Sequence, residues 1–438
     1  MTNRRDALQL LAALALVGRP AARAAAADAA TDTAAGDAAL RAALDALARQ
    51  RPTLRGASEF TEALASLARF DAVALAPSAA ADLATVRMGL ALDAALAAST
   101  AAGDAARAFA LRVARAAGER ADIAQLQRRL EAEMARLLTR ARRSFDVLGL
   151  RDGSIGERYR VLATRDDQRY TDDTAGRDAL VADLNGWVAR ARGRLPRLFD
   201  AVPAWCLDVR VEQLTVADLA ANRPGYRQLP ARRADGTTVH GAYVIDLRDM
   251  HARPRFTVGA IAPHELLPGH LLQLPLEAAA GAHPLRVEYL SAFSEGWATY
   301  AEDLMDADGL YRSGVGAGAG QDGRDDRQLA ALELGATHWM ILRALRGLLD
   351  IQLALHGWSA ERAMAQLREL QGIPAYFAPF EADVARMQKE PAHRTAEALV
   401  WLRLRELSTV AARRGGRFDF HRRVLQHGRQ PLARLATH

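Results

Sequence analysis

The chain has 438 residues, half of them hydrophobic, which is enough for a large core in two or three domains or in one helical body. Its formal net charge is +6, but residues 1–24 contribute +3 of this and acidic residues are interspersed with the arginines, which disfavours nucleic acid as a partner. Cys206 is the only cysteine, which excludes an intrachain disulfide and favours a small buried apolar residue over a nucleophile.

Residues 1–26 have the features of an export signal. A twin arginine, Arg4-Arg5, precedes an apolar run from Ala7 to Val17, and small residues suited to cleavage follow at 22–26. The run is too short to hold a bilayer as a stable anchor. We interpret the segment as a twin-arginine bacterial export signal, with an ordinary secretory signal as the alternative. Either signal predicts a periplasmic or secreted protein with no stable membrane anchor after cleavage.

Residues 27–200 are predicted to form an N-terminal helical region. Apolar residues recur at helical spacing, for example at Leu126 and Leu130, and we interpret such stripes as core. Turn and capping residues mark helix ends in the second part of this region. Residues 151–200 are expected to form a helical hairpin, in which one helix begins at Asp172/Asp173-Thr174 and another ends at Arg194–Pro196.

Residues 201–438 are predicted to form a metal-site region within the same fold unit. β-Branched residues alternate at Val209-Arg210-Val211 and again at Gly241–Ile245, and Asp235-Gly236 between them is typical of a turn. These signals predict a small β-element just before a histidine–glutamate motif, with an edge strand that could bind an extended peptide. Helices are expected to resume beyond it, with a loop over residues 313–326.

The motif His264-Glu265-Leu266-Leu267-Pro268-Gly269-His270 carries two histidines six residues apart. On a straight helix they would point about 240° apart, whereas the usual zinc-protease spacing of four residues leaves about 40°. Pro268-Gly269 gives the helix a place to distort, so we infer a two-residue insertion that bulges the helix and brings His270 back toward His264. The spacing alone leaves metal chelation and a structural histidine at a helix kink equally open.

Three glutamates follow at intervals of seven residues. Glu288, Glu295 and Glu302 are predicted to share one helix face, among apolar neighbours such as Trp297. Carboxylates that face an apolar interior are costly unless they are paired or bind a metal, so Glu295 is the candidate third ligand. Glu288 and Glu302 are candidates to orient the histidines. A solvated acidic stripe is the alternative.

Two imidazoles and a carboxylate form the ligand set of a catalytic Zn²⁺ site with one open position. Glu265, beside the first histidine, is then the candidate general base that acts on a metal-activated water. His356, Tyr376 and His393 are candidate catalytic hydrogen-bond donors to an oxyanion. For His356 the alternative is a simple cap at a helix C-terminus.

In these motifs the chain resembles the bacterial proteins of domain-of-unknown-function family 885, which are related to gluzincin metallopeptidases of the thimet-oligopeptidase and angiotensin-converting-enzyme type. The resemblance covers residues 200–438. It rests on the histidine motif, Glu295-Gly296-Trp297, Arg223-Pro224-Gly225-Tyr226, Gly241-Ala242-Tyr243-Val244 and His356-Gly357-Trp358. It implies a mainly α fold, a large helical body with a central cleft. It also implies that His264, His270 and Glu295 bind the metal and that Glu265 is the base.

The chain departs from the family pattern at Leu271 and near the C-terminus. Arg386-Met387 stands where the family tends to have Arg-Tyr. Leu271 stands where the family often has another histidine. Pro391-Ala392-His393-Arg394 stands where the family tends to have Pro-Gly-Gln-Ala, and Glu397 stands at the position of a tyrosine. If that tyrosine binds the oxyanion or the substrate, His393 is a candidate substitute.

We therefore expect a zinc-dependent hydrolase, a gluzincin-like metallopeptidase that cleaves short peptides with Glu265 as general base. The expected partner is a peptide or another small amide substrate. Two alternatives stay open: a metal-dependent hydrolase of a non-peptide amide, and a non-catalytic binding protein on a peptidase scaffold. The altered segment around His393 favours the last alternative, whereas the intact histidine and Glu295-Gly296-Trp297 motifs argue against it.

Overall fold

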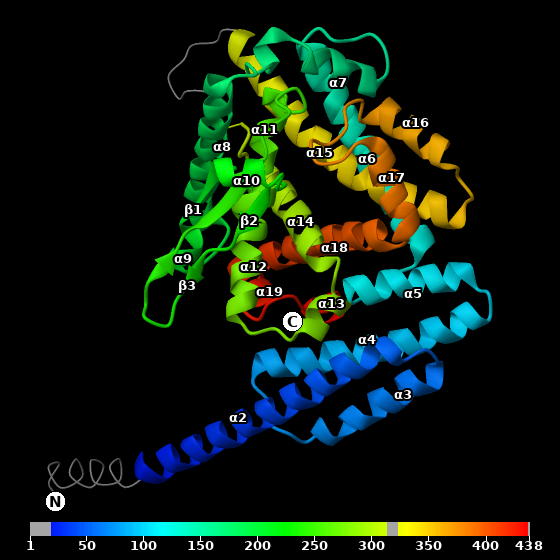
Figure 1. The fold of residues 1–438 in the computed structure, drawn as a ribbon, viewed down its shortest axis with the longest axis vertical. Helices are drawn as coiled ribbons and strands as arrows, with labels where there is room; N and C mark the ends of the chain where they lie inside the picture. Colours follow the sequence, from blue (N-terminus) through cyan, green and yellow to red (C-terminus); the bar gives the residue numbers. More distant parts are fainter. Residues whose placement is uncertain (1–18, 313–322, 437–438) are drawn as a thin grey trace, which may run out of the picture.

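The computed structural model describes residues 19–312 and 323–436, and the protein is mainly α-helical, as its sequence predicts (Figure 1). Residues 1–18 of the predicted export signal lie outside the described residues, and residues 19–26 form the beginning of the first helix. Within the described ranges, no helix is both long enough and apolar enough to cross a membrane.

The first helices form a layer at one end of the molecule, coloured blue to cyan in Figure 1. They are α2 (Arg19–Gln50), α3 (Ala57–Ser66), α4 (Pro77–Ala101) and α5 (Ala105–Ala117), with 3-10 turns η1 (Arg51–Thr53) and η2 (Leu67–Phe70) between them. Their core contains Leu40, Leu44, Val86 and Leu90, and Tyr289 from a much later helix completes it. Burial of these side chains joins this layer to the rest of the chain.

The central body consists of longer helices packed around α15. Its helices are α6 (Ile123–Val147), α7 (Ile155–Ala163), α8 (Thr174–Arg194), α11 (Arg255–Ile261), α14 (Phe293–Ala307), α15 (Gly323–Leu355), α16 (Ala360–Leu370), α17 (Phe380–Lys389) and α18 (His393–Arg413), with turns η3 (Asp166–Gln168) and η4 (Leu195–Arg197). Helix α15 packs along α6 and also against α11 and α18, while α14 packs on α18. The stripe of Leu126 and Leu130 is buried in this core, as predicted.

Side-chain caps explain why helices begin where they do. Asp173 accepts a hydrogen bond of 2.7 Å from the amide of Gly176, so α8 begins at Thr174, as predicted. The same helix ends at Arg194, where Pro196 follows within the next turn, so the two signals mark the ends of one helix and not of two as expected. Ser359 caps α16 in the same way, through the amide of Arg362. The local signals therefore fix these helix ends.

A small sheet precedes α11 in the chain. Strand β5 (Gly241–Ile245) pairs in parallel with β1 (Val209–Gln213) and antiparallel with β2 (Tyr226–Gln228), in the order β1-β5-β2. Strands β3 (Ala231–Arg232) and β4 (Thr238–Val239) form a separate antiparallel pair. All five residues of β5 are buried, and β2 is an edge strand.

The remaining helices are short, and they are α9 (Ala204–Leu207), α10 (Val216–Ala220), α12 (His270–Ala279), α13 (Pro284–Tyr289), α19 (Arg417–Leu425) and α20 (Leu432–Ala436).

The structure corrects two expectations from the sequence. Of the predicted loop over 313–326, residues 313–322 lie outside the described residues, but 323–326 belong to α15. The three glutamates do not share a helix, because Glu288 lies in α13 and only Glu295 and Glu302 lie in α14.

Candidate metal site

The two histidines lie on either side of a sharp break between helices. Helix α11 continues into a π-helical turn, η5 (Ala262–Leu266), which holds His264, and α12 begins at His270. The chain between them is extended at Leu267, and the Leu267–Pro268 peptide is cis. A Cβ atom on Gly269 would lie 1.9 Å from the carbonyl oxygen of His264, so only glycine allows the chain to fold back this closely. The predicted bulge within one continuous helix is therefore wrong. The first helix ends at Leu266, and a second helix begins at His270.

This break brings both imidazoles to the carboxylate of Glu295 in the first turn of α14. His264 Nε2 lies 3.5 Å from Glu295 Oε2, and His270 Nε2 lies 3.4 Å from Glu295 Oε1. The ring centroids are 4.9 Å apart, and the ring planes are nearly perpendicular. Burial raises the pKa of Glu295, but the two histidines outweigh it and hold the pKa well below its ordinary value.

The two histidine–glutamate donor pairs have the spacing of ligands on a small metal ion. Two ligands that bind zinc at about 2.1 Å in tetrahedral geometry lie roughly 3.4 Å apart, and both histidine–glutamate separations are close to this value. His270 Nε2 is buried and has no hydrogen-bond partner among the described residues. A buried polar atom without a partner is costly, and a metal ion would satisfy it.

Glu302 orients His264. Its Oε1 lies 2.6 Å from His264 Nδ1 and 3.4 Å from Nε of the largely buried Arg343. Burial lowers the pKa of His264, and Arg343 adds to this effect, but the carboxylates of Glu302 and Glu295 more than offset both, so the pKa is raised. A carboxylate at Nδ1 favours a proton on that nitrogen. His264 Nε2 faces Glu295, and Arg343 Nη2 lies 3.2 Å from the same nitrogen.

A chain of hydrogen bonds fixes the proton of His270. The Ser294 hydroxyl donates to Gln273 Oε1 at 2.9 Å, while the Gln273 amide donates to Glu277 at 3.1 Å, and Arg429 donates to both oxygens of Glu277 at 2.7 Å. Because the Ser294 proton is used in this way, its oxygen accepts from His270 Nδ1, 3.1 Å away. Burial also lowers the pKa of His270. Both effects favour a neutral ring with Nε2 free to bind a metal.

Glu265 is held in its charged form by an arginine of the edge strand β2. Arg227 Nε donates a hydrogen bond to Glu265 Oε2. Burial raises the pKa of this carboxyl, but Arg227 and the two histidines outweigh it, so the pKa is lowered. Glu265 is therefore ionised at neutral pH, beside the donor cluster.

The Glu295-Gly296-Trp297 motif joins the parts of the site. A Cβ atom on Gly296 would lie 2.4 Å from Cβ of Val400, so glycine allows α14 to approach α18 closely. The indole N–H of Trp297 donates to the carbonyl of Pro268 at 2.9 Å. This bond ties the helix break to the helix that carries Glu295.

A cavity of about 740 Å³ opens beside these residues, and Glu265, Glu295 and Tyr376 line it. The Tyr376 hydroxyl lies 2.6 Å from the hydroxyl of Tyr243, on strand β5. Burial, with a smaller contribution from Glu265, raises the pKa of Tyr376 to about 12. Tyr376 is therefore a neutral hydrogen-bond donor on the cavity wall.

His393 also lines this cavity, at the first residue of α18. Its Nε2 lies 3.3 Å from Oε1 of Glu397, whose hydrogen bond raises the pKa of His393. Glu397 itself is bound by two hydrogen bonds of 2.9 Å from Arg394. The position that carries a tyrosine in the family pattern is therefore part of a buried ionic cluster here.

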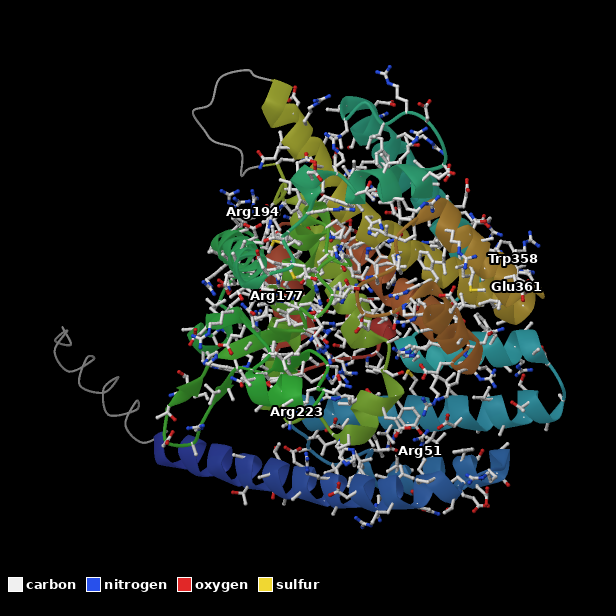
Figure 2. The ribbon with its side chains drawn as sticks, turned by 45° about the horizontal axis from the view of Figure 1, so that its top comes forward. Arg51, Arg177, Arg194, Arg223, Trp358 and Glu361 are labelled. Atoms are coloured by element: carbon white, nitrogen blue, oxygen red, sulfur yellow. The ribbon has the colours of Figure 1, made fainter. Side chains whose placement is uncertain are left out.

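The structure does not bring His356 to the site. This exposed residue follows the end of α15 and does not line the cavity, and Figure 2 shows Trp358, two residues further on, at the outer edge of the molecule. Nor does Glu288 reach the histidines, because it forms ion pairs with Arg51 and Arg115 instead. Figure 2 shows Arg51 in the N-terminal layer.

Several residues of the site were missed by the reasoning from sequence. Arg227 and Arg343 carry no distinguishing signal in a chain whose 58 basic residues include only one lysine. Ser294 could have been noticed beside Glu295, and Tyr243 lies inside the Gly-Ala-Tyr-Val motif. Leu271, where the family often has a histidine, is fully buried in the core.

The fold and the site together define a mainly helical protein with a cluster of two buried histidines and one partly exposed glutamate. The chain belongs to the family described as "Bacterial protein of unknown function (DUF885)", whose model matches residues 2–438. A search among curated proteins gives no match.

Two solved structures share this fold. A "putative lipoprotein" from Colwellia psychrerythraea superposes with a TM-score of 0.63 at 22% identity, covering 90% of this chain and 71% of that one. A "putative lipoprotein of unknown function" from Shewanella oneidensis superposes with a TM-score of 0.54 at 15% identity, covering 91% of this chain and 72% of that one. At these identities the likeness shows the fold alone.

Proposed function

We propose that the protein is a zinc-dependent hydrolase that cleaves short peptides. The observation that carries the proposal is the cluster of His264, His270 and Glu295, whose candidate ligand atoms lie within 4.8 Å of one another. Glu265 adds an ionised carboxylate next to one ligand, in the order that metallopeptidase motifs use. The relation to gluzincin peptidases is part of the same proposal and rests on the resemblance in sequence.

Zn²⁺ held by these three side chains would supply Lewis acidity, which lowers the pKa of water and polarises a carbonyl group. Glu265 accepts the proton of the attacking water and passes it to the leaving amine. Arg227 keeps this carboxylate ionised and in place. The oxyanion requires a hydrogen-bond donor. Tyr376 offers one from the cavity wall, and His393 offers a second.

The cavity supports a small substrate. Its volume of about 740 Å³ lies within the range of pockets that hold ligands of drug size, which favours a peptide of a few residues over a folded protein. Its lining mixes carboxylates, arginines and aromatic rings, so that a peptide backbone and both charged termini can be paired there.

The deciding variant is Glu265→Gln, with Glu288→Gln as the matched control because Glu288 lies outside the site. A library of short peptides and a set of N-acyl amides are incubated with each purified protein. We expect peptide cleavage that falls by at least about 100-fold in Glu265→Gln and is unchanged in Glu288→Gln. Wild-type turnover in Glu265→Gln contradicts the mechanism. Cleavage of the amides alone would indicate a non-peptide amidase, and bound metal without any cleavage would indicate a binding protein.

We also propose that the protein is exported through its twin-arginine segment. The arginine pair with its short apolar run supports this, as do the names of the two structural relatives. Changing Arg4 and Arg5 together to lysine should leave the protein in the cytoplasm when cells are fractionated. Unchanged export would indicate an ordinary secretory signal.

A further inference from the structure

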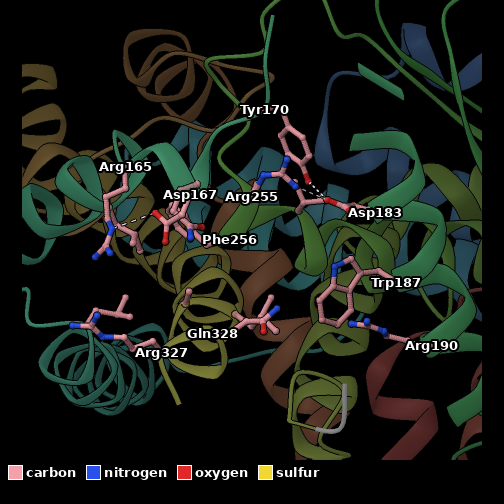
Figure 3. Close-up of a pocket in the computed structure, with 16 residues that line it drawn as sticks. Arg165, Asp167, Tyr170, Asp183, Trp187, Arg190, Arg255, Phe256, Arg327 and Gln328 are labelled. Carbon is pink, nitrogen blue, oxygen red and sulfur yellow. Dashed lines mark hydrogen bonds and ion pairs between the residues drawn. The ribbon is translucent and has the colours of Figure 1, made fainter. Parts of the chain in front are cut away.

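A second cavity, of about 610 Å³, shares no lining residue with the metal-site cavity. Figure 3 shows its labelled side chains surrounding a common hollow, with Trp187 and Arg190 at one side and Arg165 and Asp167 at the other. The walls come from η3, α8, the beginning of α11 and the beginning of α15. Its volume is that of an ordinary small-molecule site.

The cavity combines an apolar lining with an excess of positive charge. Leucine, valine and alanine side chains and the rings of Tyr170, Trp187 and Phe256 supply apolar surface. Four arginines and two aspartates also line it, a net charge of +2. A ligand with an apolar body and a negative charge would match both properties.

Two largely buried polar side chains in this cavity have no hydrogen-bond partner among the described residues. Gln168 and Trp187 are each at least nine-tenths buried, and neither side chain makes a hydrogen bond within the part of the chain that the structure describes. The polar side-chain atoms of both residues are still accessible to solvent, and both residues line the cavity. The indole N–H of Trp187 is a donor only, and in this cavity it is open to water or to an acceptor on a ligand.

Two arginines of the cavity wall, Arg255 and Arg190, differ in their interaction partners. Arg255 is fixed: its Nη1 binds Asp183 at 3.0 Å, its Nε donates to the carbonyl of Arg169, and it stacks on Tyr170. Arg190 stacks on Trp187, 4.5 Å from the ring centroid, and has no carboxylate within 4 Å among the described residues. Its charge is therefore available next to the unpaired indole N–H.

We propose that this cavity is a binding site for a small amphipathic carboxylate. The carboxylate oxygens accept from Trp187 Nε1 and pair with Arg190. The apolar body lies against Phe256 and the aliphatic lining. This inference is independent of the metal chemistry, since the two cavities have no residue in common.

The test uses the full mature protein and 4-phenylbutyrate as the probe, with 4-phenylbutanamide as the uncharged control, measured by isothermal titration calorimetry. Trp187→Phe keeps the ring and removes the N–H. Arg190→Gln changes an exposed wall residue and leaves the core intact. Arg197→Gln is the matched control for an exposed arginine outside the cavity.

We expect saturable binding of the acid and binding of the amide that is at least about fivefold weaker. Affinity should fall about fivefold in Trp187→Phe and about tenfold in Arg190→Gln, the effects of one lost hydrogen bond and one lost charged contact. Arg197→Gln and the metal-ligand variant Glu295→Ala should bind as the wild type does. Equal binding of acid and amide, unchanged affinity in Arg190→Gln, or loss of binding in Glu295→Ala would each overturn the proposal. So would the absence of any binding to the wild type.

Discussion

Glu302→Gln removes one negative charge and almost no volume from the contact with His264 Nδ1. The carboxylate is buried, lies 2.6 Å from that nitrogen, and is also the only carboxylate within 4 Å of Arg343 among the described residues. The variant therefore has two separable effects. The proton on His264 is no longer held at Nδ1 by a charged acceptor, and a buried guanidinium loses its ion pair.

Both effects have an expected size. Residues that orient metal ligands typically contribute about 10- to 100-fold in affinity, which is about 1.4–2.7 kcal/mol of binding free energy. Removing one partner of a buried ion pair costs roughly 3 kcal/mol of stability, because the remaining charge is left unpaired. The metal-free variant should therefore be less stable as well as a weaker zinc binder.

Zinc affinity is measured by competition with a chromophoric chelator, and stability by denaturant unfolding of the metal-free protein. Glu288→Gln is the control, since its carboxylate is half exposed and pairs only with arginines distant from the site. In the double variant Glu302→Gln, Arg343→Met both charges are gone, so stability should recover while zinc affinity stays reduced. Wild-type zinc affinity in Glu302→Gln would refute the role assigned to this carboxylate.

Three further variants test other parts of the site. Gly269→Ala should destabilise the protein by more than about 3 kcal/mol and abolish zinc binding, because its Cβ would lie 1.9 Å from a backbone oxygen; near-normal unfolding would contradict the fold-back. Ser294→Ala should weaken zinc binding about tenfold, because His270 Nδ1 loses the acceptor of its proton. Unchanged zinc affinity would contradict this role of Ser294. Arg227→Gln removes the charge that lowers the pKa of Glu265, so the acid limb of the kcat/KM profile should move to higher pH. An unmoved limb would show that Arg227 does not control this carboxyl.

The helices could be predicted from the sequence because their signals are local. The apolar spacing that includes Leu126 needs only neighbouring residues, and so does the cap at Asp173. The grouping of His264, His270 and Glu295 could also be proposed, because ligand types were recognisable and Pro268-Gly269 marked a break.

The rest depends on contacts between distant parts of the chain. The spacing of seven that linked Glu288 to Glu295 and Glu302 gave no sign that α13 ends at Tyr289, before α14 begins. Arg343 reaches the site from a helix that begins beyond residue 322, and Arg227 reaches it from an edge strand. The positions of these two arginines at the site cannot be derived from sequence spacing, because they depend on how separate elements pack.

The most direct test of the metal site is elemental analysis of the purified mature protein beside His264→Ala and Glu295→Ala. His356→Ala and Glu288→Gln are the matched controls, since both residues lie away from the donor cluster. We predict nearly one zinc per chain in the wild type and in both controls, and loss of zinc in both ligand variants. A wild-type protein that holds no metal even after reconstitution with zinc would contradict the site and the hydrolase proposal together.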